Sequence, residues 1–338
     1  MGRRDWIVEG LIVILTLSAA SISMARPEKG AWEVREAPMP SQRVEFTTSA
    51  VNGKIYAIGG VFWDQLPRNG KVFRTVEEYD PVTNRWQHRT GMRIARTGLS
   101  SNVVDGKIYA IGGHVQLWWW RKHVEVYDPV SDTWETKADM QEVRPTFSSS
   151  VSDGRIYVMG GAEDGSTEEY NPVVDRWERK AKMPGNRTRF ATSSVDGKIY
   201  AIGGVKFNPE KYLDTVEVYN PATDTWEKRA DMPTARCCLT AHTINGIIYA
   251  IGGGFGHGPL STVEAYDPAS DTWERMTDMP EARGGFSASV VDGKIYVFTD
   301  RLDFKPTVLV YTPPFRPPRS VNPMGKAATT WGRLKTER

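Results

Sequence analysis

Short apolar runs recur along the chain, each introduced by a polar turn and, in five of six copies, closed by two glycines. They read VNGKIYAIGG, VDGKIYAIGG, SDGRIYVMGG, VDGKIYAIGG, INGIIYAIGG and VDGKIYVFTD, and they begin at Val51, Val104, Ser152, Val195, Ile244 and Val291. The interval between neighbouring copies varies between 43 and 53 residues. Self-similarity at such a period is typical of a fold made from repeated units that stack on one another.

Each unit predicts four short strands. The first follows a recurrent arginine and consists mostly of Ser, Thr and Ala, which suit strands crowded around a central axis. The second, KIYAI in most copies, is almost wholly apolar, as expected for a strand covered on both faces. The third alternates Val and Tyr with charged residues, and an Asp-Pro or Asn-Pro turn leads to a fourth strand that carries a tryptophan.

The spacing of the aromatic residues identifies the kind of unit. In five units a tryptophan stands seven residues after the tyrosine of the third strand, at Trp86, Trp134, Trp177, Trp226 and Trp273. Together with the paired glycines, this pattern strongly resembles the kelch repeat. The resemblance covers residues 31–315 and implies an all-β fold, a six-bladed β-propeller with one repeat in each blade. Twelve of the thirteen tyrosines occupy repeat positions, so we expect them to pack between blades.

The sixth unit departs from the pattern at two places. Thr299-Asp300 replaces the paired glycines, and Pro318 stands where the tryptophan is expected, in a PPFRPP run that cannot form a central strand. At the other end of the chain, residues 31–35 (AWEVR) form a tryptophan strand with no unit before it. We therefore expect the Trp32 strand to complete the sixth blade and to close the ring.

An arginine recurs four residues after a methionine at the entry to every unit. These arginines are Arg43, Arg96, Arg144, Arg187, Arg236 and Arg283. Their regularity favours a structural role, which we expect to be binding of backbone carbonyls between blades.

The segment HVQLWWWRKH, residues 114–123, lies where the repeat leaves the chain length free. The resemblance implies that the loops after the paired glycines share one face with the loops that enter the innermost strands, and that this face binds ligands. An extended run would direct Trp118 and Trp120 to one side and Trp119 to the other. Aromatic rings beside a cation are typical of protein-binding hot spots, although the same rings could instead pack on each other to order long loops. The candidate ligand-binding residues are Phe62, Trp63, His114, Trp118, Trp119, Trp120, Arg121, Arg189, Phe207, Phe255 and His257.

Arg189 is included because none of the other five units has an arginine at this position. The residues there are Glu45, Gly98, Thr146, Cys238 and Gly285. A guanidinium there is able to pair with a carboxylate through two hydrogen bonds.

Composition narrows the choice of partner. A net charge of +2 argues against a nucleic-acid-binding surface.

The two cysteines, Cys237 and Cys238, are adjacent, so no disulfide framework is expected. On a strand their side chains would point to opposite faces.

The N-terminal residues predict export. Arg3 and Arg4 precede an apolar stretch, and Ser23 and Ala25 supply small residues at the two positions that a signal peptidase inspects. Residues 1–25 therefore resemble a signal peptide that is cleaved after Ala25. An uncleaved anchor is the alternative. We expect a secreted or periplasmic protein without a membrane span after cleavage, with the propeller at residues 26–315 and a Pro-rich, basic tail at 316–338.

Catalysis receives less support from the residues. Copper-radical oxidases of the kelch type need two histidines, two tyrosines and a coupled cysteine, and the five histidines here include none adjacent to a tyrosine. No histidine or cysteine cluster has the spacing of metal ligands, so we expect no metal and no cofactor. Exported six-bladed kelch proteins that interconvert sialic acid anomers offer an alternative, with a carboxylate and a cation at the channel mouth. Arg187 and Arg189 are available for it, with the acids Glu163, Asp164, Glu210 and Asp214 on nearby loops, but catalytic residues stay unassigned.

The sequence thus predicts an exported binding module that recognises a protein or a glycan through loops on one face. A sialic-acid mutarotase-like epimerase is the alternative function. The oligomeric state is left open.

Overall fold

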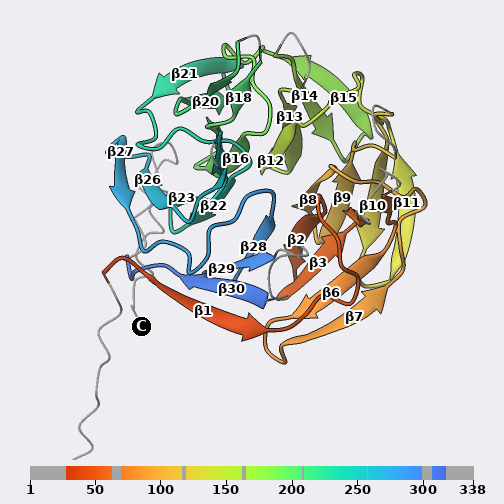
Figure 1. Cartoon of the computed structure of the whole chain (residues 1–338). Coiled ribbons are helices and arrows are strands. Elements are labelled where there is room, and N and C mark those ends of the chain that lie inside the picture. The colour runs from red at the N-terminus through yellow and green to blue at the C-terminus, as the bar shows by residue number, and fades with distance from the viewer. Residues whose placement is uncertain are drawn as a thin grey trace, which may run out of the picture.

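The computed structural model describes residues 28–62, 70–115, 119–161, 165–207, 209–256, 258–298 and 307–316. The predicted signal peptide, the altered Thr299-Asp300 turn and the tail from residue 317 lie outside these residues. The described residues form six four-stranded antiparallel sheets, which Figure 1 shows arranged as blades around a common centre. The predicted all-β six-bladed propeller is confirmed.

The blades follow the chain in order. The first contains β2 (Thr47–Val51), β3 (Lys54–Ile58), β6 (Val76–Asp80) and β7 (Arg85–Arg89), and the second β8 (Ser100–Val104), β9 (Lys107–Ile111), β10 (Val124–Asp128) and β11 (Thr133–Lys137). The third contains β12 (Ser148–Ser152), β13 (Arg155–Met159), β14 (Thr167–Asn171) and β15 (Arg176–Lys180), and the fourth β16 (Ala191–Val195), β17 (Lys198–Ile202), β20 (Val216–Asn220) and β21 (Thr225–Arg229). The fifth contains β22 (Thr240–Ile244), β23 (Ile247–Ile251), β26 (Val263–Asp267) and β27 (Thr272–Arg275). The sixth contains β28 (Ser287–Val291), β29 (Lys294–Phe298), β30 (Thr307–Thr312) and β1 (Ala31–Glu36).

The N-terminal strand β1 is the outer strand of the sixth blade. It pairs with β30 in antiparallel register, with Trp32 opposite Tyr311. In each blade the ring of the outer tryptophan lies about 5 Å from the ring of the third-strand tyrosine, measured between ring centres. The indole N–H donates to a backbone carbonyl in the segment that connects the preceding blade to the tryptophan's own blade. Trp32 makes the same two contacts, 4.9 Å from Tyr311 and 3.0 Å from the carbonyl oxygen of Thr277.

The apolar core lies between neighbouring blades. Each buried cluster combines side chains of two adjacent sheets, because the second strands are covered on both faces. The second-strand tyrosine of one blade contacts the third-strand tyrosine of the next, as in the pair Tyr56 and Tyr127, whose ring centres are 5.8 Å apart. The same pairing occurs at all six interfaces, which confirms that the tyrosines pack between blades.

Hydroxyl groups connect the innermost strands. Ser49 on β2 bonds to Ser101 on β8 at 2.7 Å, and Ser193 on β16 bonds to Thr243 on β22 at 2.8 Å. The small residues of these strands therefore do more than allow close packing, because their hydroxyls form hydrogen bonds with one another between blades.

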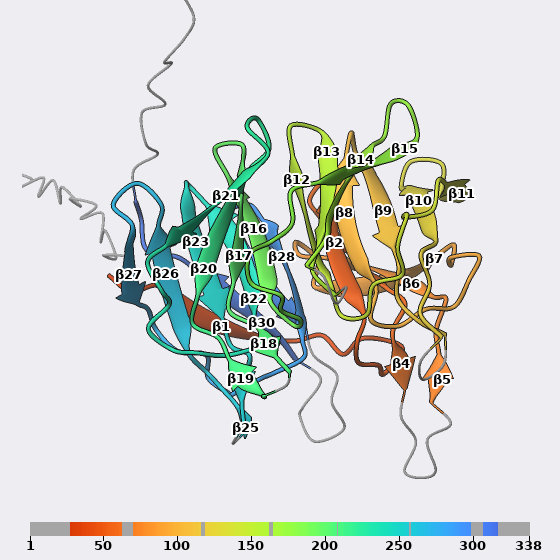
Figure 2. The ribbon, with the colours of Figure 1, turned by 90° about the horizontal axis from the view of Figure 1, so that it is seen from above.

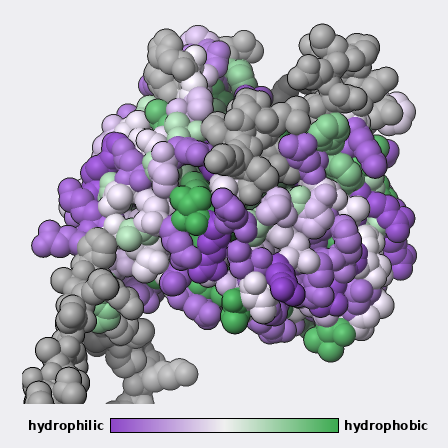
Figure 3. All heavy atoms as spheres, turned by 60° about the horizontal axis from the view of Figure 1, so that its bottom comes forward, coloured by the Kyte–Doolittle hydropathy of each residue, from purple (hydrophilic) through white to green (hydrophobic). Residues whose placement is uncertain are grey.

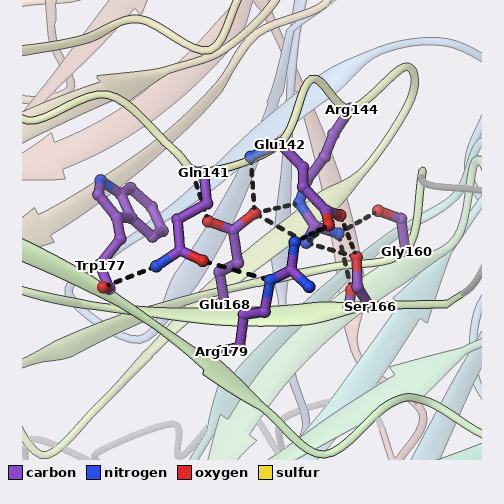
Figure 4. A network of polar contacts seen from close by, with 8 residues as sticks. All are labelled: Gln141, Glu142, Arg144, Gly160, Ser166, Glu168, Trp177 and Arg179. Carbon is purple, nitrogen blue, oxygen red and sulfur yellow. Dashed lines mark hydrogen bonds and ion pairs between the residues drawn. The ribbon is translucent and has the colours of Figure 1, made fainter.

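The recurrent arginines are buried within their own blade. Arg144 donates to the carbonyls of Gly160 (2.9 Å) and Ser166 (2.7 Å) and to the carboxylate of Glu168, whose side chain is also fully buried. Figure 4 shows this network. Backbone carbonyls were expected as partners, but their expected location between blades is wrong. The fully buried guanidinium needs several acceptors at once, and the ends of β13 and β14 in its own blade supply them.

Four other blades repeat the ion pair, and the sixth does not. The pairs are Arg43 with Glu77, Arg96 with Glu125, Arg187 with Glu217 and Arg236 with Glu264, at 2.5 to 3.0 Å. In the sixth blade Leu309 stands at the position of the glutamate, and Arg283 instead bonds to Glu281 and Thr307. The blade can thus hold its arginine with a different set of acceptors.

Replacing Gly203 with alanine is expected to destabilise the protein by several kcal/mol. Gly203 has a φ of +64°, and a Cβ built there would lie 2.6 Å from the carbonyl oxygen of Arg236 in the next unit. Both the left-handed conformation and the clash disfavour a side chain, at about 1–2 kcal/mol for the conformation alone.

Gly197→Ala is the matched control for this prediction. Gly197 has a similar φ of +74°, but its Cβ would meet only a side-chain oxygen at 3.6 Å. Urea unfolding of both variants should show the larger loss for Gly203→Ala. Equal losses would mean that the contact between units does not constrain the paired glycines.

Candidate functional site

The loops after the paired glycines and the loops that enter the innermost strands lie on one side of the ring. The residue after the recurrent arginine pairs through two backbone hydrogen bonds with the residue after the paired glycines, as Val44 does with Val61 and Thr188 with Val205. Short hairpins extend some of these loops: β4 (Val61–Phe62) with β5 (Lys71–Val72), β18 (Val205–Lys206) with β19 (Lys211–Tyr212), and β24 (Gly254–Phe255) with β25 (Gly258–Pro259). Figure 2 shows them projecting from the same side, here called the loop face.

Six residues meet at the centre of the loop face, one from each blade just before its innermost strand. All six have a left-handed backbone with φ between 51° and 69°. Four backbone hydrogen bonds link neighbours around the ring, among them the one from Cys238 N to the Arg189 carbonyl at 2.8 Å. These residues, here called the central hexad, are Glu45, Gly98, Thr146, Arg189, Cys238 and Gly285.

Arg189 is the cationic member of the central hexad. Its side chain is exposed, and its guanidinium carbon lies 5.9 Å from the ring centre of Phe207, a residue whose exposed fraction is 55%. An aromatic face beside an exposed guanidinium restricts its motion while leaving its N–H donors free for a ligand. The structure therefore brings together two of the residues predicted from the sequence.

Glu45 is the anionic member, and it belongs to the blade opposite Arg189 in the ring. Its carboxylate accepts a hydrogen bond from Thr97 Oγ1 at 3.1 Å and lies 3.8 Å from Nε2 of His114. His114 is buried, and its ring packs edge-on against Trp120 at 4.5 Å between ring centres. The centre of the loop face thus carries a positive charge on the fourth blade and a negative charge on the first.

The described tryptophans of the run divide as their alternation predicts. Trp120 is half-buried on His114, whereas Trp119 exposes 62% of its surface. The backbone N–H of Arg121 bonds to the Gly113 carbonyl and holds the end of the loop against the blade. Trp120 therefore packs against His114, whereas the ring of Trp119 is largely exposed.

The other predicted site residues are more dispersed. Phe62 is half-buried on β4 opposite Lys71, and Phe255 lies on β24 opposite Gly258. Trp63, Trp118 and His257 lie outside the described residues, as do the candidate acids Glu163 and Asp164. The aromatic candidates are thus spread over the loops of the first, second, fourth and fifth blades.

The two cysteines lie side by side next to Arg189. Their Sγ atoms are 3.3 Å apart and both thiols are free. The expectation that they point to opposite faces is wrong, because the left-handed backbone of Cys238, with a φ of +55°, interrupts the alternation of a strand. The hydrogen bond from Cys237 and the positive charge of Arg189 lower the pKa of the Cys238 thiol to about 7.

Sequence reasoning singled out Arg189 but missed Glu45 and Cys238 as site residues. All three occupy the same position of the repeat, two residues after the recurrent arginine. The available signal was that this position changes residue type in most units, whereas the residue directly after it is always Phe or Leu. A position that varies inside a regular repeat is one that the fold leaves free for function.

Within the described ranges, no group of three or more His, Cys, Asp or Glu side chains is placed to bind a metal ion. The same ranges include no helix with the length and apolar character needed to cross a membrane. Figure 3 views the molecule from the side of β1, and in its described part hydrophobic residues form small patches separated by hydrophilic ones.

Comparison with known proteins gives the same architecture. A family described as "FKB95, Kelch-repeats domain" matches residues 26–182, and the "Kelch motif" matches residues 186–233 and 235–280. Together the matches run through five of the six blades.

Several curated proteins are similar over part of the chain. F-box/kelch-repeat protein At5g26960 of Arabidopsis thaliana is 41% identical over 76 residues, 22% of this chain and 17% of that protein. Kelch-like protein 25 of Homo sapiens is 37% identical over 84 residues, 25% and 13% of the two chains. Kelch-like ECH-associated protein 1B of Danio rerio is 31% identical over 96 residues, 28% and 16% of the two chains. The similarity thus spans less than a fifth of each of these relatives.

Proposed function

Because the chain belongs to the kelch-repeat family, we propose that it is a protein-binding module whose loop face recognises an acidic segment of a partner. The observation that carries this proposal is Arg189, an exposed guanidinium at the centre of the loop face with an aromatic ring beside it. Arginine suits a carboxylate better than lysine does, because its planar donors form two parallel hydrogen bonds.

Trp119 supports the proposal from the edge of the same face. A tryptophan with 62% of its surface exposed is uncommon on a protein without a partner, and tryptophan and arginine are the residues most enriched in binding hot spots. We propose that Trp119 covers an apolar part of the partner while Arg189 binds its carboxylate.

The proposal includes the place of action. We propose that the chain is exported through its N-terminal residues 1–25 and meets its partner outside the cytoplasm. Fractionation of the producing cells, with the N-terminal residue of the recovered protein determined, tests this. A mature chain that begins at Arg26 supports export, and a full-length chain in the cytoplasmic fraction contradicts it.

Arg189→Ala is expected to weaken partner binding at least about 10-fold, equivalent to about 1.4 kcal/mol. The test selects peptides on the full-length protein from a random displayed library and measures their affinity for wild type and variant. Selected peptides should be rich in Asp and Glu and should bind less tightly as salt is raised, because the attraction is electrostatic.

Arg176→Ala is the matched control, since Arg176 is also exposed but lies on the outer strand β15. It should bind the peptides like wild type. Peptides without acidic residues, or equal losses for both variants, would contradict recognition through Arg189.

Sugar ligands are the second candidate, and the charge pair of the central hexad favours them. A carboxylate on one side and a guanidinium on the other is the combination that a sugar-acid epimerase needs, with the carboxylate as general base and the guanidinium as anion clamp. The same full-length protein would be tested on a glycan panel and for anomer exchange of sialic acid. Exchange that depends on both Glu45 and Arg189 would replace the protein-binding proposal.

A further inference from the structure

The cysteine pair of the loop face takes no part in the proposed recognition, yet its geometry is unusual. We propose that Cys238 is a site of reversible oxidation by hydroperoxides, and that Cys237 is the thiol that converts the oxidised Cys238 into a bridge between the two adjacent residues.

The backbone brings the two sulfur atoms together. Cys237 pairs with Gly254 through two backbone hydrogen bonds, at 3.0 and 2.8 Å, which hold it in extended geometry. Cys238 takes the left-handed conformation required of every member of the central hexad, and its N–H bonds to the Arg189 carbonyl. The change of conformation between the two residues turns both side chains to the same side, with the Sγ atoms 3.3 Å apart.

The surroundings give the two sulfurs different roles. Cys238 is half-buried and therefore accessible to a small oxidant, whereas Cys237 is buried. The hydrogen bond from Cys237 and the Arg189 guanidinium favour the Cys238 thiolate, whereas partial burial and the carboxylate of Glu45 oppose it; the net effect is a lowered pKa of the Cys238 thiol. Hydrogen bonding to Cys238 and burial raise the pKa of Cys237, so Cys237 keeps its proton. Reactive cysteines are accessible thiolates with a second thiol nearby, and Cys238 meets both conditions.

The reaction uses one hydroperoxide and leaves water. The Cys238 thiolate attacks one oxygen of hydrogen peroxide; a sulfur–oxygen bond forms, the oxygen–oxygen bond breaks, and the hydroxide that leaves takes a proton to become water. Sulfur is oxidised by two electrons and the peroxide is reduced. The Cys237 sulfur then attacks the Cys238 sulfenic acid; the sulfur–sulfur bond forms, and the hydroxyl leaves with the Cys237 proton as a second water.

The product should be easily reduced. The Cα atoms of adjacent residues are about 3.8 Å apart, whereas disulfide-bonded residues usually lie about 4.4–6.8 Å apart. A bridge between Cys237 and Cys238 is therefore strained, and strained bridges are the readily reversed ones.

Intact-mass measurement tests the proposal cleanly, because the full-length chain contains two cysteines and no others. The reduced protein is treated with hydrogen peroxide at pH 7. Wild type should lose about 2 Da, the two thiol hydrogens, and regain them with a thiol reductant. Cys237→Ser should instead gain about 16 Da as a sulfenic acid that dimedone traps. Cys238→Ser should react at least about 10-fold more slowly than Cys237→Ser.

The role of Arg189 has its own readout. Arg189→Ala should slow oxidation at pH 7 but not at pH 10, where the thiolate forms without assistance. Arg176→Ala should behave as wild type at both pH values. Wild-type oxidation that adds oxygen without losing hydrogen, or Cys238→Ser that reacts as fast as Cys237→Ser, would overturn the proposal.

Discussion

Replacing Glu168 with alanine is expected to destabilise the protein by about 3–5 kcal/mol, because the variant removes the buried and closer counter-charge of the buried Arg144 guanidinium and leaves it only the partly exposed Glu142 carboxylate at 3.6 Å. Arg144 and Glu168 are both fully buried, and the carboxylate accepts from Nη2 and Nε of Arg144 at 2.9 and 3.0 Å. It also accepts the backbone N–H of Gln141 at 2.7 Å. The substitution therefore removes the carboxylate that contacts the Arg144 guanidinium and, at the same time, the acceptor of the Gln141 backbone N–H.

Urea unfolding followed by tryptophan fluorescence measures this loss. Glu178→Ala is the control: Glu178 lies on the outer strand of the same blade, and its exposed carboxylate contacts Lys180. An exposed ion pair contributes little to stability, so the control should unfold at the wild-type urea concentration. A Glu168→Ala variant that unfolds with the control would show that the buried pair does not stabilise the blade.

The sixth blade suggests a second variant that separates charge from packing. It carries Leu309 where the other blades have glutamate. The double variant Arg144→Met/Glu168→Leu replaces the whole ion pair with apolar side chains, and such replacements are often neutral or stabilising. It should therefore lose less stability than Glu168→Ala alone. A larger loss would mean that the carbonyls of Gly160 and Ser166, rather than Glu168, make the arginine indispensable.

Deleting residues 1–36 is expected to have the second large effect, a loss of at least about 3 kcal/mol together with aggregation. The deletion removes β1 from the sixth blade and with it Trp32, which packs on Tyr311. Loss of a fully buried tryptophan costs about 3–5 kcal/mol, and this deletion removes the half-buried Trp32 together with all six paired residues of β1. It also exposes the edge of β30, and an unpaired edge strand promotes association with other chains.

Contacts on both sides of β1 explain why the effect should reach beyond one blade. Trp32 bonds to Thr277 of the fifth blade, and Arg35 donates to the Pro81 carbonyl of the first blade at 2.8 Å. β1 therefore contacts both of the blades that flank the sixth. The prediction that this strand holds the ring closed depends on these contacts.

Thermal unfolding and size-exclusion chromatography of two truncated chains test this prediction. A chain without residues 1–27 keeps β1 and should behave as wild type, whereas the chain without residues 1–36 should unfold at lower temperature and form oligomers. Adding a synthetic peptide of residues 28–39 should restore the longer truncation, as an added strand does when it completes a sheet edge. Equal stability of the two chains would show that the ring closes without β1.

The repeat pattern alone was sufficient for the strands, for the blade number and for the roles of the aromatic residues. Because the same local pattern occurs in six copies, each copy supports the strand assignment in the others. A strand such as KIYAI is apolar on both faces in every copy that contains it. Tyr56 and Tyr127 pack across a blade interface because every unit presents the same two rings at the same register. Strand positions and ring register depend on short stretches of sequence, so they could be predicted from the order of residues along the chain.

The partners of the charged and polar side chains were decided only by the tertiary structure. Arg144 meets Glu168 inside its own blade, and His114 meets Glu45 of the preceding one. The left-handed backbone of the central hexad places Arg189 beside Cys238 and turns the Cys238 thiol toward Cys237. These contacts depend on how far each unit is rotated about the centre of the ring, and on backbone conformations that are disfavoured for ordinary residues and are held by neighbouring blades. The sequence by itself determined the scaffold, whereas stacking of the blades into a ring determined which side chains meet at its centre.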